Sequence, residues 1–234
     1  MLRDIGPGLR HYNVLMGFKF PDPVETAVDA GPFGAWLAAA SASLRGTAGT
    51  EVPCGDCVGC CVSSYHIPLR EQDAAAIERI PEQHLVQSRA GQLHIQYRPD
   101  GLCPMLEERR CTIYAHRPQT CRDYDCRFFA AAGIEAGGPE RSVINTRVRQ
   151  WRFTYPTTAD RRAHEAVRSA AAFLQREAHR FPAGFAPTRP TGIAVLAVKT
   201  HSVFLVGGAA EADAAALAQA MVDACRRFDA GAEG

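Results

Sequence analysis

Hydrophobic residues recur at helical spacing in three parts of the chain, and this pattern predicts three helices. On residues 33–45 the apolar stripe consists of Phe33, Trp36, Leu37, Ala40 and Leu44. Gly46 can end this helix. The same spacing occurs in alanine-rich sequence over residues 159–180 and 209–228. The first of these two stretches opens with the capping candidates Thr157, Thr158 and Asp160.

Between these helices the pattern predicts shorter elements. Residues 65–69 form a short extended segment, and residues 70–80 form a helix that Pro81 stops. Alternating apolar positions over residues 92–97 predict a strand. Two apolar runs of the stretch 103–114, separated by E107-E-R-R110, predict a small hairpin.

Two further segments carry a weaker pattern. Residues 191–206 form a β-branched run that fits either a buried helix or a pair of strands, and we favour the helix. Residues 1–30 show turn signals without a sustained period, which is typical of an extended arm over a core.

The combined pattern predicts an α+β fold that is mainly helical. We expect one domain over residues 1–234. In it, a small cysteine-rich metal module with short strands (about 50–130) packs on a C-terminal helical part (about 140–230) and is preceded by the N-terminal helix. The chain has 234 residues, of which 47% are hydrophobic and 22% charged, which is enough for a sizeable core.

The net charge and the hydropathy of the chain indicate its cellular location and the partners to expect. A formal net charge of +1 gives no general attraction to nucleic acid or acidic membranes, so a nucleic-acid partner and a membrane are not expected. No apolar run approaches the roughly 20 residues of a membrane span, and the N-terminus lacks the pattern of a secretory signal. We therefore expect a cytoplasmic protein, whose thiols are kept reduced.

Because the thiols are expected to stay reduced, the cysteines are better explained as metal ligands than as disulfide partners. The stretch C54-G-D-C-V-G-C-C61 holds four of the nine cysteines of the chain. Eight cysteines are clustered and are our candidate metal ligands: Cys54, Cys57, Cys60, Cys61, Cys103, Cys111, Cys121 and Cys126. In C-x-x-C the two thiolates can reach one ion or one cluster, and Gly55 and Gly59 supply the backbone freedom for the turns. Neighbouring side chains usually diverge, so Cys60 and Cys61 are expected to serve different purposes.

The later cysteines supply the distant ligands that close such a site. Pro118 fits the first turn of a helix, which would place Cys121 near the positive helix end. A four-thiolate zinc site carries a net charge of about −2. Arginines that alternate with these cysteines could offset this charge or could be ordinary surface residues: Arg110, Arg117, Arg122 and Arg127.

The cysteine pattern resembles the YkgJ-type CxxCxxCC cysteine-cluster family, whose domain is described as zinc- or iron-chelating. The resemblance rests on C54-G-D-C-V-G-C-C61, L102-C-P-M-L and C111-T-I-Y-A-H-R-P-Q-T-C-R, and covers roughly residues 50–130. It marks seven signature positions, from Cys54 to Cys121, with Cys126 as a less fixed companion. The same module occurs in flagellin lysine N-methylases, but the rest of those longer enzymes has no match here.

The sequence leaves several alternatives for what the clustered cysteines bind and for the function of the protein. An iron–sulfur cluster is preferred, [4Fe–4S] above all, because three cysteines follow at x₂ spacing. Zinc is the alternative, either in a structural module or in a metal-handling protein, and two Cys₄ zinc sites would also use eight thiols. An S-adenosylmethionine-dependent lysine N-methylase-like enzyme is the second alternative. With a redox-active cluster, we expect electron transfer or an accessory redox role, with a protein or redox partner that the sequence does not identify.

Other candidate residues favour plainer interpretations. His66 and His116 could be ligands, but ordinary hydrogen-bonded or exposed histidines are the better interpretation. Cys225 is expected to pack on a helix. The basic stretch from Arg141 to Arg152 could contact RNA or an anionic cofactor, but a solvated edge is favoured. No phosphate-binding, dinucleotide-binding, zinc-protease or nucleophile-elbow motif occurs, so whether the chain is an enzyme stays open.

Overall fold

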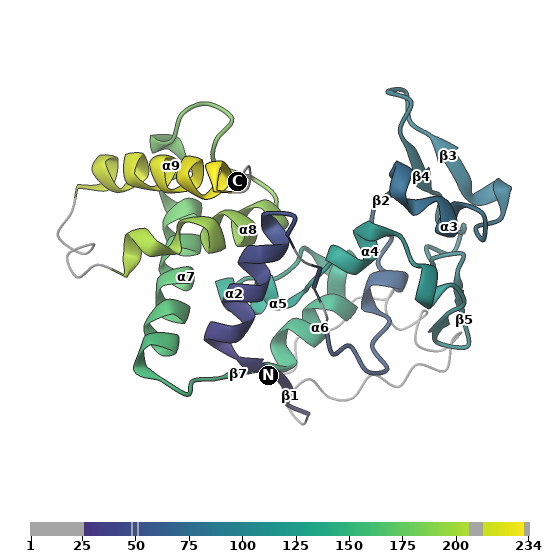
Figure 1. Cartoon of the computed structure of the whole chain (residues 1–234), viewed down its shortest axis with the longest axis horizontal. Helices are drawn as coiled ribbons and strands as arrows, with labels where there is room; N and C mark the ends of the chain where they lie inside the picture. The colour runs from purple at the N-terminus through teal and green to yellow at the C-terminus, as the bar shows by residue number, and fades with distance from the viewer. Residues whose placement is uncertain (1–25, 48, 51, 206–212, 232–234) are drawn as a thin grey trace.

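The computed structural model describes residues 26–47, 49–50, 52–205 and 213–231. Most of the arm expected over residues 1–30, and residues 209–212 of the last predicted helix, lie outside these ranges. In the described residues the hydrophobic side chains form two clusters. We call their surroundings the helical lobe (26–47, 124–205 and 213–231) and the cysteine lobe (49–50 and 52–123), which lie side by side in Figure 1.

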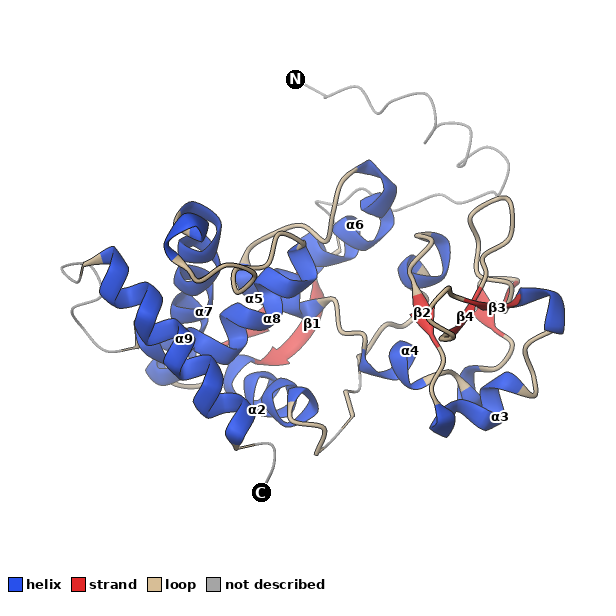
Figure 2. Ribbon diagram, turned by 90° about the horizontal axis from the view of Figure 1, so that it is seen from above, coloured by secondary structure: helices blue, strands red, loops and turns tan. Residues whose placement is uncertain are grey.

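The helical lobe confirms the main sequence prediction of an α+β fold that is mostly helical. Its helices are α2 (Phe33–Leu44), α5 (Arg127–Ala132), α6 (Ser142–Gln150), α7 (Thr158–Arg176), α8 (Pro190–Thr200) and α9 (Ala214–Ala230). Helix α7 contacts α2, α5 and α8, and these helices pack together in one half of the molecule in Figure 2. The core includes the fully buried Phe33, Phe129 and Leu174. Helix α8 confirms the helical interpretation of the β-branched run.

Helix α7 begins where the sequence predicted a cap. The Thr157 hydroxyl accepts the Asp160 N–H at 3.1 Å, and the Asp160 carboxylate accepts the Thr157 N–H at 2.9 Å. This reciprocal pair satisfies two backbone donors that a helix start leaves without intrahelical acceptors.

A parallel strand pair of the helical lobe was not predicted. Strand β1 (Val28–Pro32) pairs with β7 (Trp151–Thr154), and the register shifts between Asp29 and Gly31. Gly31 has a φ of 83°, which an L side chain rarely adopts. Neither segment shows a run of alternation long enough to predict a strand. The basic stretch from Arg141 to Arg152 was expected to be a solvated edge. In the structure it forms α6 and the start of β7, and this strand closes the core.

The cysteine lobe consists of very short elements. Its strands are β2 (Ile67–Pro68), β3 (Leu85–Gln87), β4 (Leu93–Ile95), β5 (Leu106–Glu107) and β6 (Arg110–Cys111), and its helices are α3 (Ala74–Ile77) and α4 (Gln119–Asp123). Strands β2, β4 and β3 form an antiparallel sheet in that order, and β5 pairs with β6. The predicted strand and hairpin are thus confirmed.

The helix predicted over residues 70–80 is shorter than expected. A 3₁₀ turn (Glu71–Asp73) precedes α3, because the buried Asp73 carboxylate accepts the Arg70 N–H at 2.8 Å. The same carboxylate accepts the Gln119 N–H at 2.7 Å. Asp73 therefore satisfies the first backbone donors of two segments and ties the start of α4 to the 3₁₀ turn that precedes α3.

The two lobes meet where the 3₁₀ turn η1 (Gly59–Val62) contacts α6. A Cβ atom on Gly59 would lie 3.3 Å from Ile144 Cγ1 and 3.5 Å from Cys57 Sγ. A side chain at position 59 would thus crowd Ile144, so glycine favours this close approach, whereas Gly55, with a φ of 57°, supplies the turn freedom that the sequence suggested for both glycines.

None of the helices in the described part of the chain combines the length and the apolar character that crossing a membrane requires.

The β5–β6 hairpin turns through Glu108 and Arg109, whose φ values are 43° and 63°. Two central residues with positive φ define a type I′ turn, for which Asn is better suited than Glu. We expect Glu108→Asn to raise the free energy of unfolding by less than about 1 kcal/mol, since it relieves left-handed strain. Denaturant unfolding measures this change. Glu107→Asn, in the adjoining strand, is the matched control and should bring no gain; equal gains at both positions would contradict the turn argument.

Candidate metal centre

A cavity of about 600 Å³ opens in the cysteine lobe, and seven of the eight candidate cysteines line it. These are Cys54, Cys57, Cys60, Cys61, Cys103, Cys111 and Cys121. The eighth, Cys126, is buried in the core of the helical lobe. Among the described residues, no three His, Cys, Asp or Glu side chains are arranged as a ready metal site. The thiols therefore share one region, and their role as ligands stays a prediction.

The effects of these thiols on one another's pKa divide them into two groups. The first thiol group consists of Cys54, Cys57, Cys60 and Cys126. The turn at Gly55 brings the Cys57 N–H to the Cys54 carbonyl at 3.0 Å. Burial raises the pKa of Cys60, and the thiols of Cys126, Cys54 and Cys57 raise it further. Burial also raises the pKa of Cys126 to about 12, with contributions from Asp125, Cys57 and Cys54. The first three cysteines come from the cysteine lobe and the fourth from the helical lobe.

The second thiol group consists of Cys61, Cys103, Cys111 and Cys121. The Cys103 N–H donates to the Cys61 carbonyl at 2.7 Å. The Cys61 thiol donates to the Cys103 sulfur, and this bond raises the pKa of Cys61 and lowers that of Cys103. Burial raises the pKa of Cys121 to about 12, and Cys103 and Cys111 add to this effect. All four side chains belong to the hydrophobic cluster of the cysteine lobe or pack against it.

Cys60 and Cys61 are consecutive in η1 yet belong to different groups, as the divergence of neighbouring side chains predicts. The two groups lie next to each other, since Cys121 of the second group is close enough to Cys60 of the first to raise its pKa. The protonated thiols would have to release protons when a metal binds.

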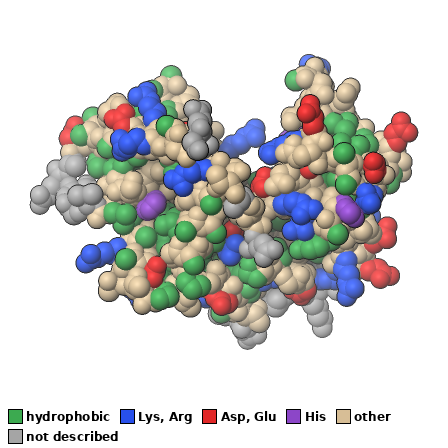
Figure 3. All heavy atoms as spheres, in the orientation of Figure 1, with side chains coloured by type: hydrophobic (Ala, Val, Ile, Leu, Met, Phe, Trp, Pro, Cys, Tyr) green, Lys and Arg blue, Asp and Glu red, His purple; other side chains and the backbone are tan. Residues whose placement is uncertain are grey.

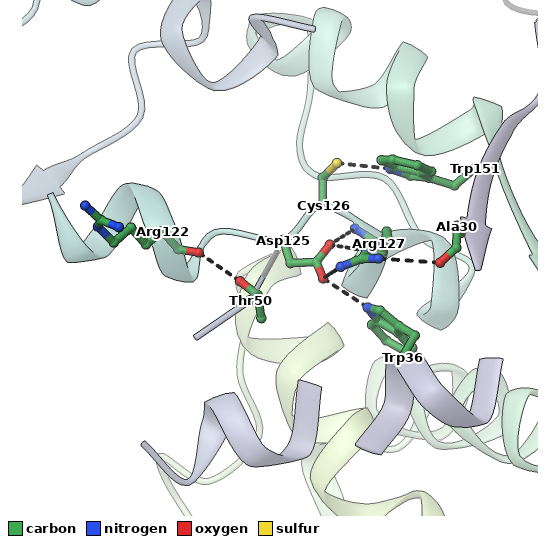
Figure 4. Close-up of polar contacts among 8 residues, drawn as sticks. All are labelled: Ala30, Trp36, Thr50, Arg122, Asp125, Cys126, Arg127 and Trp151. Atoms are coloured by element: carbon green, nitrogen blue, oxygen red, sulfur yellow. Dashed lines mark hydrogen bonds and ion pairs between the residues drawn. The ribbon is translucent and has the colours of Figure 1, made fainter. Parts of the chain in front are cut away.

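Cys126 is held in place by a buried network around Asp125 (Figure 4). The Asp125 side chain is 0% exposed and forms an ion pair with Arg127 at 2.8 Å. Trp36 Nε1 donates to the same carboxylate at 3.0 Å, and Arg127 Nη1 donates to the Ala30 carbonyl at 3.4 Å. The network thus joins α2 and β1 to the residues on both sides of Cys126.

Three donor side chains surround the first thiol group. Trp151 Nε1 donates to Cys126 Sγ at 3.1 Å (Figure 4). Arg147 lies over the Trp151 ring at 5.7 Å and lowers the pKa of Cys54. Tyr124 lines the cavity, and the thiols of Cys60 and Cys126 contribute to raising its pKa, which burial raises most.

Two of these side chains carry a buried donor atom without an acceptor, although the Nη2 atom of Arg147 also pairs with Asp56 at 3.5 Å. In the described part of the structure, the Tyr124 hydroxyl and Arg147 Nε have no hydrogen-bond partner. A buried donor without a partner is costly, at about 1–3 kcal/mol. An anionic centre on the neighbouring sulfurs would supply acceptors and negative charge. The donor set and the four thiols therefore fit a thiolate-ligated metal or cluster.

The arginines near the cysteines differ in their environment. Arg127 is buried, and the guanidinium of Arg117 lowers the pKa of both Cys111 and Cys121. Arg110 and Arg122 line the cavity. Arg117 is therefore placed to offset the negative charge of the thiolates, as the sequence suggested. Arg127 instead pairs chiefly with Asp125. In the basic stretch, the Arg147 side chain is only 13% exposed, so the expected solvated edge is wrong at this residue.

The remaining candidates follow the plainer interpretation. His66 and His116 are exposed, and neither is among the described residues that line the cavity. Cys225 packs against the core of the helical lobe from α9. Sequence reasoning did not identify Trp151, Tyr124 or Asp125, although D123-Y-D-C-R surrounds Cys126 with two of them.

Residues 53–141 match the family model CxxCxxCC, described as "Putative zinc- or iron-chelating domain". This match confirms the resemblance and supports metal binding in general, without choosing between zinc and iron. A comparison with curated proteins found no match, and a comparison with solved structures found none either.

The Asp125 network generates a stability prediction. Asp125→Ala leaves the Arg127 guanidinium buried without its carboxylate, so we expect the free energy of unfolding to fall by about 3–5 kcal/mol. Asp229→Asn is the control, because Asp229 pairs with Lys199 on the surface, where an ion pair contributes less than about 1 kcal/mol. Chemical denaturation followed by circular dichroism gives both values. Similar small losses for the two variants would show that the buried pair is not a structural anchor.

Proposed function

We propose that this chain, which carries a CxxCxxCC domain over residues 53–141, holds a [4Fe–4S] cluster on its first thiol group and serves an electron-transfer or accessory redox role. The proposal rests on one observation. Cys126 is grouped with the cysteines of C54-x₂-C57-x₂-C60, and its sulfur accepts a hydrogen bond from the Trp151 N–H. Three cysteines at x₂ spacing with a fourth from elsewhere are typical of cuboidal iron–sulfur ligation.

The cavity, which three cysteines of the first thiol group line, has room for a cluster. Its volume is about 600 Å³, whereas by the same measure a cavity of about 10–15 Å³ already holds one water molecule. Each iron of a cubane takes one thiolate, so its four sulfurs can stand further apart than the ligands of one zinc ion. This agrees with thiols that are grouped but, among the described residues, do not converge on one point.

The rim of the cavity fits a negatively charged redox partner. Arg109, Arg110 and Arg117 line it, and Tyr114 beside them is 59% exposed. Exposed aromatic and arginine side chains are enriched at protein interfaces. A bound cluster would supply one-electron chemistry, and this rim would place the partner near it.

All nine cysteines lie in the described ranges and are free thiols. Free thiols are kept reduced in the cytoplasm, which we propose as the location of the protein.

Anaerobic purification with iron and sulfide analysis and an optical spectrum tests the proposal. We expect brown protein with about four iron and four acid-labile sulfide per cluster. Cys126→Ser should lose most of both, because it removes the fourth ligand. Cys225→Ser, which changes a thiol outside the cavity, should keep them. Stoichiometric zinc without sulfide in the wild-type protein would overturn the cluster.

The Trp151 N–H should influence the redox properties. Donors to cluster sulfurs stabilise the more negative, reduced state, so Trp151→Phe should lower the midpoint potential. Trp36→Phe is the matched control, since Trp36 donates to Asp125 and not to a sulfur. Potentiometric titration of the reconstituted proteins compares them. A potential that falls equally in both variants would count against a direct N–H···S effect.

A further inference from the structure

We infer that a second cavity, formed between the two lobes, is a binding site for a free α-amino acid whose side chain is apolar. This inference goes beyond the proposed function and does not rest on it, because neither the thiols nor a metal takes part in the site.

The inter-lobe cavity has a volume of about 530 Å³, and Figure 3 shows the surface hollowed between the two lobes. Sites for small molecules commonly measure about 300–1,000 Å³ and occur preferentially where two structural units meet. The helical lobe forms its walls with the end of α2, with α5 and with the start of α8. The cysteine lobe forms them with the 3₁₀ turn that precedes α3 and with α4. A ligand would thus contact segments that are distant in sequence.

The walls carry one guanidinium and one carboxylate that are accessible to a ligand. Arg70 Nη1 lies 3.8 Å from Asp123 Oδ2, and the two side chains are 49% and 36% exposed. Such an exposed pair contributes little to stability, so a ligand can replace it. Asp125 also lines the cavity, but Arg127 neutralises its charge. The accessible charges therefore cancel, which disfavours a multiply charged anion and favours a zwitterion.

The spacing of the two charges suits an α-amino acid. Its ammonium and carboxylate groups are attached to the same carbon atom, so they can reach Asp123 and Arg70 together. Gln119 Nε2 donates to Asp123 Oδ1 at 2.6 Å, which orients the carboxylate and leaves Oδ2 on the side of Arg70. An arginine can bind a carboxylate through two parallel N–H···O bonds. The pair can therefore open to hold both ends of the zwitterion.

The helical lobe supplies an apolar surface for the side chain of the ligand. Leu44, Phe128, Phe129 and Val195 line the cavity there. Phe128 and Phe129 belong to the core of this lobe, so their positions are fixed by packing. An apolar side chain that covers this surface contributes binding free energy in proportion to the area it removes from water. Glycine lacks this contribution.

Two tyrosines stand between this cavity and the one that the cysteines line. Tyr124 lines both cavities. Tyr65 lines the cysteine cavity, and its hydroxyl lies 3.4 Å from the hydroxyl of Thr191, which lines the inter-lobe cavity. The two tyrosine rings contact each other edge to face, with centroids 4.6 Å apart. A bound amino acid would therefore lie one layer of side chains from the candidate metal centre.

Isothermal titration calorimetry of the anaerobically purified protein with L-leucine, L-methionine and L-phenylalanine tests the site. We expect saturable binding of at least one of them. The tightest is then compared with its amide, which lacks the carboxylate, with its deaminated acid, which lacks the ammonium group, and with glycine. Each of these should bind at least about tenfold more weakly, because a charged hydrogen bond or the apolar contact is lost.

Two pairs of variants locate the binding. Arg70→Gln should weaken it by at least about tenfold, whereas Arg226→Gln, which changes an exposed arginine of α9, should bind as the wild type does. Ser43→Trp should abolish binding, because it fills the cavity from the end of α2. Ser202→Trp, at an exposed serine outside the cavity, should leave binding unchanged.

Three results would overturn the inference. The first is no saturable binding of the three amino acids at millimolar concentration. The second is equal affinity for the deaminated acid, which would show that the ammonium group is not recognised. The third is equal weakening by Arg70→Gln and Arg226→Gln. The iron and sulfide content, which decides the proposed function, is measured independently of all three.

Discussion

The buried ion pair between Asp125 and Arg127 is the constraint on which the arrangement of the molecule depends. Removing two charges from water is expensive, and it is tolerated here because Trp36 Nε1, the Arg127 N–H and the Ala30 carbonyl complete the hydrogen bonds. The residue between the two charges is Cys126. Its sulfur therefore lies beside Trp151 of β7, between two residues that bond to α2 and β1, and the other thiols must approach it there.

Relative to Asp125 and Arg127, the two thiol groups occupy different places in the fold. The first group draws sulfurs from both lobes, so a bound centre would link the helical lobe to the loop of Cys54 and Cys57. The second group lies within the cysteine lobe. The close contact of Gly59 with Ile144 brings both groups within one turn of η1. The lobes are thus joined by packing at α6 and by the region of Cys126.

Much of the fold and of the candidate site could be predicted from the sequence, because the relevant signals are local. The stripe of Phe33 and Trp36, the cap of Thr157 and the cysteine spacing each depend on residues within a few positions of one another. That Cys60 and Cys61 diverge follows from their adjacency, but which other cysteines join each of them could not be predicted, because this depends on contacts between segments distant in sequence. Likewise, nothing near Trp151 in the sequence indicates that its N–H meets a sulfur 25 positions earlier.

The strand pair β1–β7 has a consequence for how the protein is made. Chains fold as they leave the ribosome, N-terminal part first. All eight clustered cysteines have emerged before Trp151, the residue that pairs with Val28 and covers Cys126. The contact of Trp36 with Asp125 spans 89 positions, and closing such long loops is slow. There is consequently an interval during synthesis in which every candidate ligand is present and the helical lobe is still open, and delivery of the metal would be easiest then.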